Sequence, residues 1–153
     1  MTTIPPEFRA LPAVKNPFIS ANGPVYVRWQ EQRFTMGFMV EERHCNSANM
    51  CHGGMLMTLA DMTLLVGCNI QTNIRQFLVT VSLSADMLAS AYQGDWIEGS
   101  CEVLRQSKNM VVAQGKLSVQ GKNIVRMNGL FKPIGEPNSH PGAAAMFGLT
   151  ENP

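Results

Sequence analysis

The sequence predicts an α+β fold, in which one curved antiparallel sheet of about six strands wraps around a single long central helix. The first observation behind this prediction is the apolar stretch GGMLMTLADMTLLVGCNI, residues 53–70, which is long enough for roughly five helical turns. The second is a series of runs rich in β-branched and aromatic residues before and after that stretch. One helix among several strands fits a sheet that buries one face against the helix.

Two strands are expected before the helix. The run VYVRW begins at Val25, and the run RFTMGFMV ends at Val40. A polar break near residues 30–32 separates them, so the two runs predict a hairpin. Residues 41–51 are expected to form a loop that leads into the helix, and residues 71–76 form a polar connector after it.

Four strands are expected after the helix. Residues 78–88 show a period-two pattern, which predicts one buried face made of Val79, Val81, Leu83, Ala85 and Met87. Three further runs cover residues 96–105, 110–120 and 124–132. A turn at residues 121–123 is expected to close a hairpin between the last two, and Pro133 to end the final strand.

Length and composition predict one domain. The chain has 153 residues and 45% apolar content, enough for one sizeable core. Residues 24–133 are expected to form the folded domain. Residues 1–23 hold four of the nine prolines and are expected to form an N-terminal extension or short helix. Residues 134–153, rich in Gly, Pro and Ala, are expected to be a flexible C-terminal tail.

The charge distribution excludes two classes of partner. Twelve basic and eleven acidic residues give a net charge of +1 without any run of like charge, so we expect neither a nucleic-acid nor a membrane partner. The first residues lack the basic and apolar regions of a secretion signal, so we predict a cytoplasmic protein. The helical stretch approaches the length of a membrane span, but Asp61 near its middle favours a helix surrounded by its own protein.

The four cysteines are irregularly spaced, which predicts free thiols and no disulfide framework. The pairs His44-Cys45 and Cys51-His52 superficially suggest zinc, but their spacing is not a usual ligand pattern, and we predict no metal. No cofactor is predicted either. Cys51 is also a poor candidate nucleophile, because no acidic residue is predicted to orient His52.

One short segment holds both a candidate base and a candidate oxyanion hole. Asp61 is the only charged residue between Gly53 and Ile70, and burying it costs several kcal/mol unless it is paired, protonated or placed at a cleft. The residues His52-Gly53-Gly54 stand at the expected helix N-terminus, where unpartnered amides and the helix dipole suit an anionic oxygen. The structural alternatives are a buried Asp bonded to a strand amide or hydroxyl, and glycines that permit a sharp turn.

The order of these elements resembles the hotdog-fold acyl-CoA thioesterases, specifically the phenylacetate-degradation type. The resemblance covers residues 24–133. The family has similar sequence at the positions of three segments of this chain, GPVYVRW, RHCN and VTVSLSADMLASA. The features that carry it are, in chain order, Asn46, His52-Gly53-Gly54, Asp61 and the hydroxyl of Thr80. The chain departs from the family at Asn49, where relatives often have glycine, and at Ser90, where they often have proline.

The resemblance implies hydrolysis of an acyl-CoA thioester to a free acid and CoA, at a site shared by two subunits. It implies that the Gly53 amide polarises the thioester carbonyl, while Asp61 acts as a general base on water or as a nucleophile. By the same resemblance, Asn46 would bind the substrate carbonyl or the water. His52 would shape the turn that aims Gly53, and Thr80 would hold the attacking water near Asp61.

Helix geometry supports the shared site independently. Eight residues separate Gly53 from Asp61, roughly 12 Å of axial rise, so the two groups of one chain lie too far apart to act together on one thioester. In a two-fold dimer with antiparallel helices, Gly53 of one chain could face Asp61 of the other. We therefore predict a homo-oligomer, a dimer or a tetramer.

Two rival functions stay open at this stage. A hotdog hydratase or dehydratase would need a histidine to move a substrate proton, and His52 is the candidate nearest the helix. A non-catalytic acyl-thioester binding module would not need Asp61. The acyl group itself is not specified by spacing, and the candidates for holding the CoA phosphates are Arg75, Arg105, Lys108 and Lys132.

Overall fold

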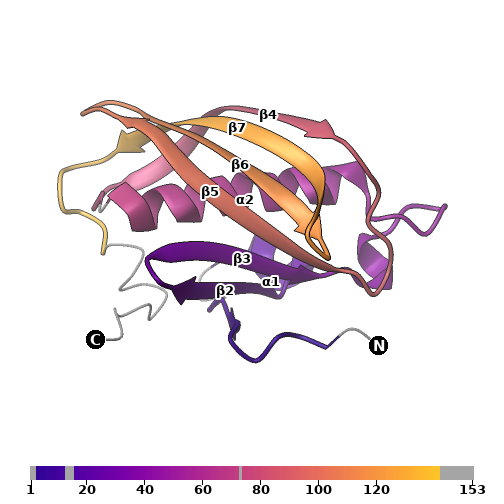
Figure 1. Ribbon diagram of the computed structural model, residues 1–153. Coiled ribbons are helices and arrows are strands. Elements are labelled where there is room, and N and C mark those ends of the chain that lie inside the picture. The colour runs from indigo at the N-terminus through magenta and orange to yellow at the C-terminus, as the bar shows by residue number, and fades with distance from the viewer. Residues whose placement is uncertain (1–2, 13–15, 73, 142–153) are drawn as a thin grey trace.

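The computed structural model describes residues 3–12, 16–72 and 74–141. One helix lies against one antiparallel sheet with the strand order β1-β2-β3-β5-β6-β7-β4 (Figure 1). The α+β prediction is therefore confirmed, with a seventh, two-residue strand added to the six expected. The long elements are β2 (Val25–Gln30), β3 (Arg33–Met39), α2 (Gly53–Thr72), β4 (Phe77–Met87), β5 (Trp96–Gln106), β6 (Val111–Val119) and β7 (Lys122–Ile134).

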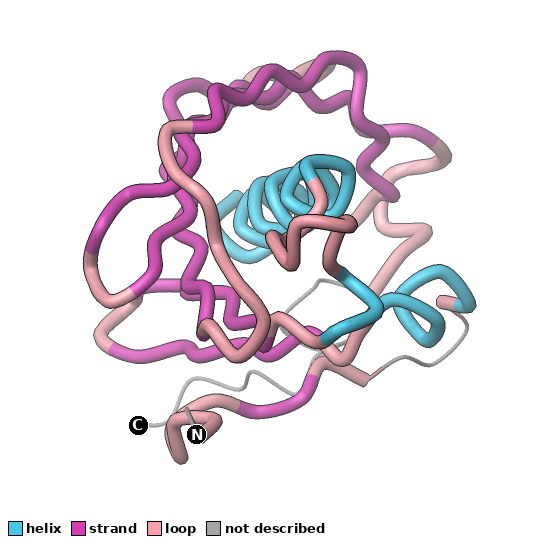
Figure 2. The backbone as a smooth tube through the Cα atoms, turned by 90° about the vertical axis from the view of Figure 1, so that its right-hand side faces the viewer, coloured by secondary structure: helices cyan, strands magenta, loops and turns pink. Residues whose placement is uncertain are grey.

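The sheet curves around α2, which occupies its hollow (Figure 2). Small residues let the two layers approach closely. A Cβ added at Gly67 of the helix would lie 2.4 Å from Cβ of Cys101, and one added at Gly99 of β5 would lie 2.5 Å from Oγ1 of Thr63. Nine helical residues are buried on this side: Met55, Leu56, Leu59, Ala60, Thr63, Leu64, Val66, Gly67 and Cys68.

The opposite side of α2 is only partly covered. Met57, Asp61, Met62 and Leu65 are half-buried, so the expectation of a helix surrounded by its own protein holds on only one side in the single chain. Among the described residues, α2 is the one helix with the length and apolarity of a membrane span, and half of it is buried in the protein. Core helices of soluble proteins meet the same criterion.

A β-bulge in β4 changes which side chains face the helix. The pairing of β4 with β7 slips by one residue between Thr80 and Ser82, which leaves Val81 unpaired. Leu78 before the bulge is buried, whereas Val81 is 58% exposed. The predicted alternation with Val79 and Val81 on the buried face is therefore wrong on the N-terminal side of the bulge. There, the inward positions are those of Leu78 and Thr80.

The last hairpin differs from the prediction at both ends. Gln120 and Gly121 both have positive φ, 49° and 77°, as in a two-residue turn that suits the sheet twist, so β7 already begins at Lys122. Strand β7 also continues through Pro133, which pairs with Leu78. The pairing of β6 with β7 ends at Phe131, so among the described residues one edge of β7 has no ladder beyond that point, and strand edges of this kind tolerate proline.

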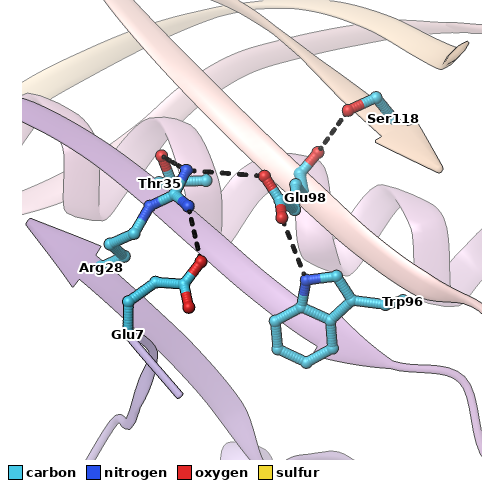
Figure 3. A network of polar contacts seen from close by, with 6 residues as sticks. All are labelled: Glu7, Arg28, Thr35, Trp96, Glu98 and Ser118. Atoms are coloured by element: carbon cyan, nitrogen blue, oxygen red, sulfur yellow. Dashed lines mark hydrogen bonds and ion pairs between the residues drawn. The ribbon is translucent and has the colours of Figure 1, made fainter. Parts of the chain in front are cut away.

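The N-terminal segment is held onto the sheet. It contains β1 (Arg9–Ala10), which pairs with β2, and α1 (Pro17–Asn22). Arg28 of β2 donates a hydrogen bond to Glu7 at 3.2 Å and forms a 3.6 Å ion pair with Glu98, which also accepts from the Trp96 indole (Figure 3). These contacts join the start of the chain to β2 and β5. The tail predicted at residues 134–153 lies mostly outside the described residues.

Candidate active site

His52 caps the N-terminus of α2. Its carbonyl oxygen accepts hydrogen bonds from the amides of Met55 (2.8 Å) and Leu56 (3.1 Å), and its ring Nδ1 accepts from the Gly54 amide at 2.9 Å. The imidazole thus does what a Ser or Asn side chain does at most N-caps. Because Nδ1 is an acceptor, this cap requires the neutral tautomer with its proton on Nε2. His52 therefore orders the turn immediately before Gly53.

Gly53 is the first residue of the helix, and it is exposed. Within the described residues its amide has no hydrogen-bond acceptor, as is usual for the first helical turn. A Cβ added at Gly53 would meet nothing within 4 Å, and the residue is exposed. Neither crowding nor a left-handed conformation requires glycine here within one chain. The positive end of the helix dipole is thus accessible at this point.

Asp61 and Thr80 form the central contact of the site. The Thr80 hydroxyl of β4 donates a hydrogen bond to Oδ1 of Asp61 at 2.6 Å, from an edge strand to the half-covered side of α2. Within the described part of the chain, Oδ2 of Asp61 accepts no hydrogen bond. The bulge at Val81 makes this contact compatible with the inward-facing residues later in β4. A carboxylate with one oxygen held and the other free can accept a proton or attack an electrophile.

Asn46 lies in the loop before the helix and uses its side-chain oxygen to order that loop. Its Oδ1 accepts hydrogen bonds from the amides of Ala48 (2.9 Å) and Met50 (3.2 Å). Asn49, the departure from the family's glycine, has a φ of 59°, a left-handed conformation that asparagine adopts more easily than most residues. Of the Asn46 side chain, only the Nδ2 amide is left to contact a substrate or water. The role expected for Asn46, binding of the substrate carbonyl or the water, therefore depends on Nδ2.

Of the residues that suggested zinc, Cys45 and Cys51 face each other, but Nδ1 of His44 and Nδ1 of His52 each accept a hydrogen bond from a backbone amide. Among the described residues, no group of three or more His, Cys, Asp and Glu is placed to hold a metal ion. His44 is buried, with its ring 4.7 Å from that of Phe38 and its Nδ1 accepting from the Glu41 amide, and burial lowers its pKa. Burial also raises the pKa of Cys51 to about 12, so this thiol is a weak nucleophile at neutral pH.

The single chain assembles two parts of the site and keeps them apart. His52 and Gly53 stand at the helix N-terminus, and Asp61 meets Thr80 about two turns further along, roughly 12 Å away. Hollows of about 880 and 240 Å³ lie elsewhere, and neither is lined by Gly53, Asp61 or Thr80. We assign the site by its chemistry, because a surface that a second chain would enclose need not form a pocket in one chain. The bulge at Val81 is the site element that the sequence reading missed, since regular alternation gave no signal of it.

Comparison with known proteins identifies the family. A family model described as the thioesterase superfamily matches residues 48–125, which include Gly53, Asp61 and Thr80. The chain belongs to the thioesterase superfamily. One relative is a "Putative esterase" of Pseudomonas aeruginosa. It is 30% identical to this chain over 132 residues, which cover 86% of this chain and 98% of the relative.

Solved structures confirm the hotdog fold of this superfamily member. The PaaI protein from the phenylacetic acid degradation operon of Escherichia coli has a TM-score of 0.71 at 24% identity, covering 81% of this chain and 88% of its own. The BH2602 protein of Bacillus halodurans, solved with CoA, has a TM-score of 0.65 at 23% identity, covering 72% of this chain and 74% of its own. At these identities the likeness is one of fold.

Proposed function

We propose that this thioesterase-superfamily member hydrolyses acyl-CoA thioesters to a free acid and CoA, at a site completed by two chains. The observation that carries the proposal is the 2.6 Å hydrogen bond between Thr80 and Asp61, on the half-covered side of the helix. A carboxylate fixed in orientation and accessible on one oxygen is suited to general-base or nucleophilic work. Family membership and the CoA bound by the BH2602 protein support the substrate class.

In the proposed reaction the thioester carbonyl oxygen accepts a hydrogen bond from the Gly53 amide at the positive end of α2. As a base, Asp61 removes a proton from water, the water oxygen attacks the carbonyl carbon, and the carbon–sulfur bond breaks to release CoA thiolate, which is then protonated. As a nucleophile, Asp61 itself attacks, and water then hydrolyses the mixed anhydride. Both routes use the same residues in the same places.

A second chain would supply the missing half of each site. Strand β4 ends the sheet order, so within the described residues one edge of this eleven-residue strand has no neighbour. Long unpaired edges are normally shortened, charged or covered. The apolar side chains on β4 are nevertheless exposed, at 54% for Phe77, 58% for Val81 and 44% for Met87. Antiparallel pairing of two β4 strands would cover this edge and place two copies of α2 side by side.

Lysine at position 81 should separate the chains and abolish activity together. Val81 lies next to Ser82, the middle residue of β4, so in a two-fold pairing of this strand two lysines would lie close to each other. Val81→Thr keeps a β-branched neutral residue and serves as the control. Light scattering after size exclusion should show a smaller particle for Val81→Lys only, with CoA release lost in parallel. A Val81→Lys protein that is monomeric but fully active would contradict the shared site.

Removing the Thr80 hydroxyl should slow hydrolysis moderately. A hydrogen bond to a charged group contributes about 1.5–3 kcal/mol, so Thr80→Val should reduce kcat by roughly 10- to 100-fold. Thr80→Ser retains the hydroxyl and should retain most of the activity. The comparison is made by following free-thiol release at saturating substrate. Equal rates in Thr80→Val and the original protein would show that this contact is structural only.

The hydratase alternative is less well supported by the geometry. Nδ1 of His52 already accepts the Gly54 amide, so only Nε2 is left for proton transfer. A panel of small aromatic, hydroxylated aromatic and medium-chain acyl-CoAs, assayed for both thiol release and enoyl-CoA hydration, tests the reaction class and finds the acyl group. Hydration without thiol release would replace the proposal. Binding of the esters with neither reaction would favour a binding module. We also propose that the protein acts in the cytoplasm.

A further inference from the structure

Cys45 and Cys51 stand at the foot of the loop that carries Asn46. The two residues face each other in an isolated antiparallel bridge. The flanking hydrogen bonds are Asn46 N to Met50 O and His52 N to His44 O, both 2.8 Å. Because their neighbours make both bonds, Cys45 and Cys51 occupy a non-hydrogen-bonded position, where facing side chains are closest.

This register has the dimensions of a disulfide. Facing residues at such positions have Cα atoms about 4.5 Å apart, inside the usual range for bonded cysteines. Both residues are free thiols in the structure. Cys45 Sγ donates a weak hydrogen bond to the Glu41 carbonyl at 3.5 Å, which a rotation about χ1 toward Cys51 would break.

We propose that Cys45 and Cys51 are a disulfide-forming pair whose oxidation closes the loop of residues 46–50 beside the N-terminus of α2. The inference goes beyond the proposed hydrolysis and does not depend on it. The crosslink would join the residue before Asn46 to the residue before the cap His52. It would hold both in the arrangement that the flanking hydrogen bonds already impose.

A low-molecular-weight disulfide such as oxidised glutathione supplies the oxidising equivalents. The thiolate of Cys45, the less buried of the two, attacks one glutathione sulfur, breaks that disulfide and releases one glutathione thiolate. Cys51 then loses its proton to solvent and attacks Sγ of Cys45, expelling the second glutathione. In sum, two protein thiols and one oxidised glutathione give one protein disulfide and two reduced glutathiones.

The charges at the pair favour this order of attack. Burial is the larger cause of the raised pKa of Cys51, and the neighbouring Cys45 adds to it. Once Cys45 is in a mixed disulfide it carries no charge, so its contribution to that raised pKa is lost. Burial continues to keep Cys51 mostly protonated, so the second step should accelerate as the pH rises.

Cys68 and Cys101 provide an internal control. Cys68 of α2 is fully buried, and Cys101 of β5 packs against Gly67 with its Sγ donating to the Leu64 carbonyl at 3.7 Å. A hydrogen bond with Cys68 and burial raise the pKa of Cys101. These two thiols are near each other, but Cys68 is fully buried, whereas Cys101 is half-buried and lines the 880 Å³ hollow, so a link between them is the competing outcome of oxidation.

The test uses the folded full-length protein treated with oxidised glutathione and then alkylated. Before alkylation, we expect the intact mass to fall by the mass of two hydrogens. On alkylation, two of the four thiols should not react, and peptide mapping should identify a disulfide between Cys45 and Cys51. The Cys51→Ser variant should accumulate a glutathione adduct on Cys45. The Cys45→Ser variant should form no intramolecular disulfide, so its mass should not fall by two hydrogens. The Cys68→Ser variant should form the disulfide as the original protein does. Dithiothreitol should reverse the change.

Thermal unfolding gives a second readout. A crosslink in native geometry constrains the unfolded chain, so Tm should rise by several degrees in the original protein and in Cys68→Ser, but not in Cys45→Ser. The proposal is overturned if the folded protein accumulates only a mixed disulfide, if the link joins Cys68 to Cys101, or if oxidation lowers Tm. Whether thioester hydrolysis is lost or retained affects neither the disulfide mapping nor the Tm measurement.

Discussion

Asp61→Asn should lower kcat for acyl-CoA hydrolysis by about 10²- to 10⁴-fold, the usual contribution of a general base. Asparagine has the shape of aspartate, and its Oδ1 can still accept the hydrogen bond that Thr80 donates at 2.6 Å. It cannot accept a proton from water or attack a thioester as an anion. The expected result is thus a folded, oligomeric protein that has lost the chemical step.

Three measurements separate this loss from structural damage. The Tm and the particle size of Asp61→Asn should match those of the original protein, and a non-hydrolysable CoA thioester analogue should bind with similar affinity. Asp61→Ala, which also removes the Thr80 contact, should be equally inactive but less stable. Unchanged hydrolysis in either variant would end the enzyme assignment as drawn. Single-turnover hydrolysis in heavy-oxygen water, with label found in Asp61, would favour nucleophilic attack.

Gly53→Pro should reduce kcat by about 10²- to 10³-fold, the effect of removing one oxyanion-hole donor in other enzymes. Proline has no amide hydrogen, yet it is well tolerated as the first residue of a helix, where that hydrogen has no intrahelical partner. Position 53 directly follows the cap residue His52, and a Cβ there meets nothing within 4 Å. The substitution thus removes the proposed donor with little expected cost in folding.

Gly53→Ala is the matched control, because it adds a Cβ but keeps the amide. If the amide is the donor, Gly53→Ala should retain far more activity than Gly53→Pro, while both keep the Tm and oligomeric state of the original protein. Equal, large losses in both would indicate that the open space beside Gly53 matters and not its hydrogen bond. Full activity in Gly53→Pro would exclude this amide from the oxyanion hole.

The sequence identified the candidate residues because their chemistry is unusual where they stand. A lone aspartate in an apolar helix is costly to bury, and two glycines after a histidine mark a helix start, so Asp61 and His52-Gly53-Gly54 could be selected from residue type and spacing. The helix itself and the order of the long strands followed from hydrophobic periodicity, which local sequence encodes directly.

The position of Thr80 could not be obtained in this way. Strict alternation placed its side chain with the polar residues of β4, away from the face of Val79 and Val81. The bulge at Val81 reverses that assignment, and it depends on the register with β7, some fifty residues along the chain. The same applies to Pro133, which stays in a strand because its neighbour β6 has already ended.

The sequence by itself determined which elements and functional groups are present. These are a long apolar helix with one carboxylate, a glycine at the start of that helix, and a set of strands to cover one side of it. Only the tertiary structure decided that the carboxylate meets the Thr80 hydroxyl, that Gly53 lies exposed at the helix start, and that Cys45 faces Cys51. The physical reason is range. Residue type and periodicity act within a few turns, whereas strand register and side-chain contacts depend on segments brought together only by folding.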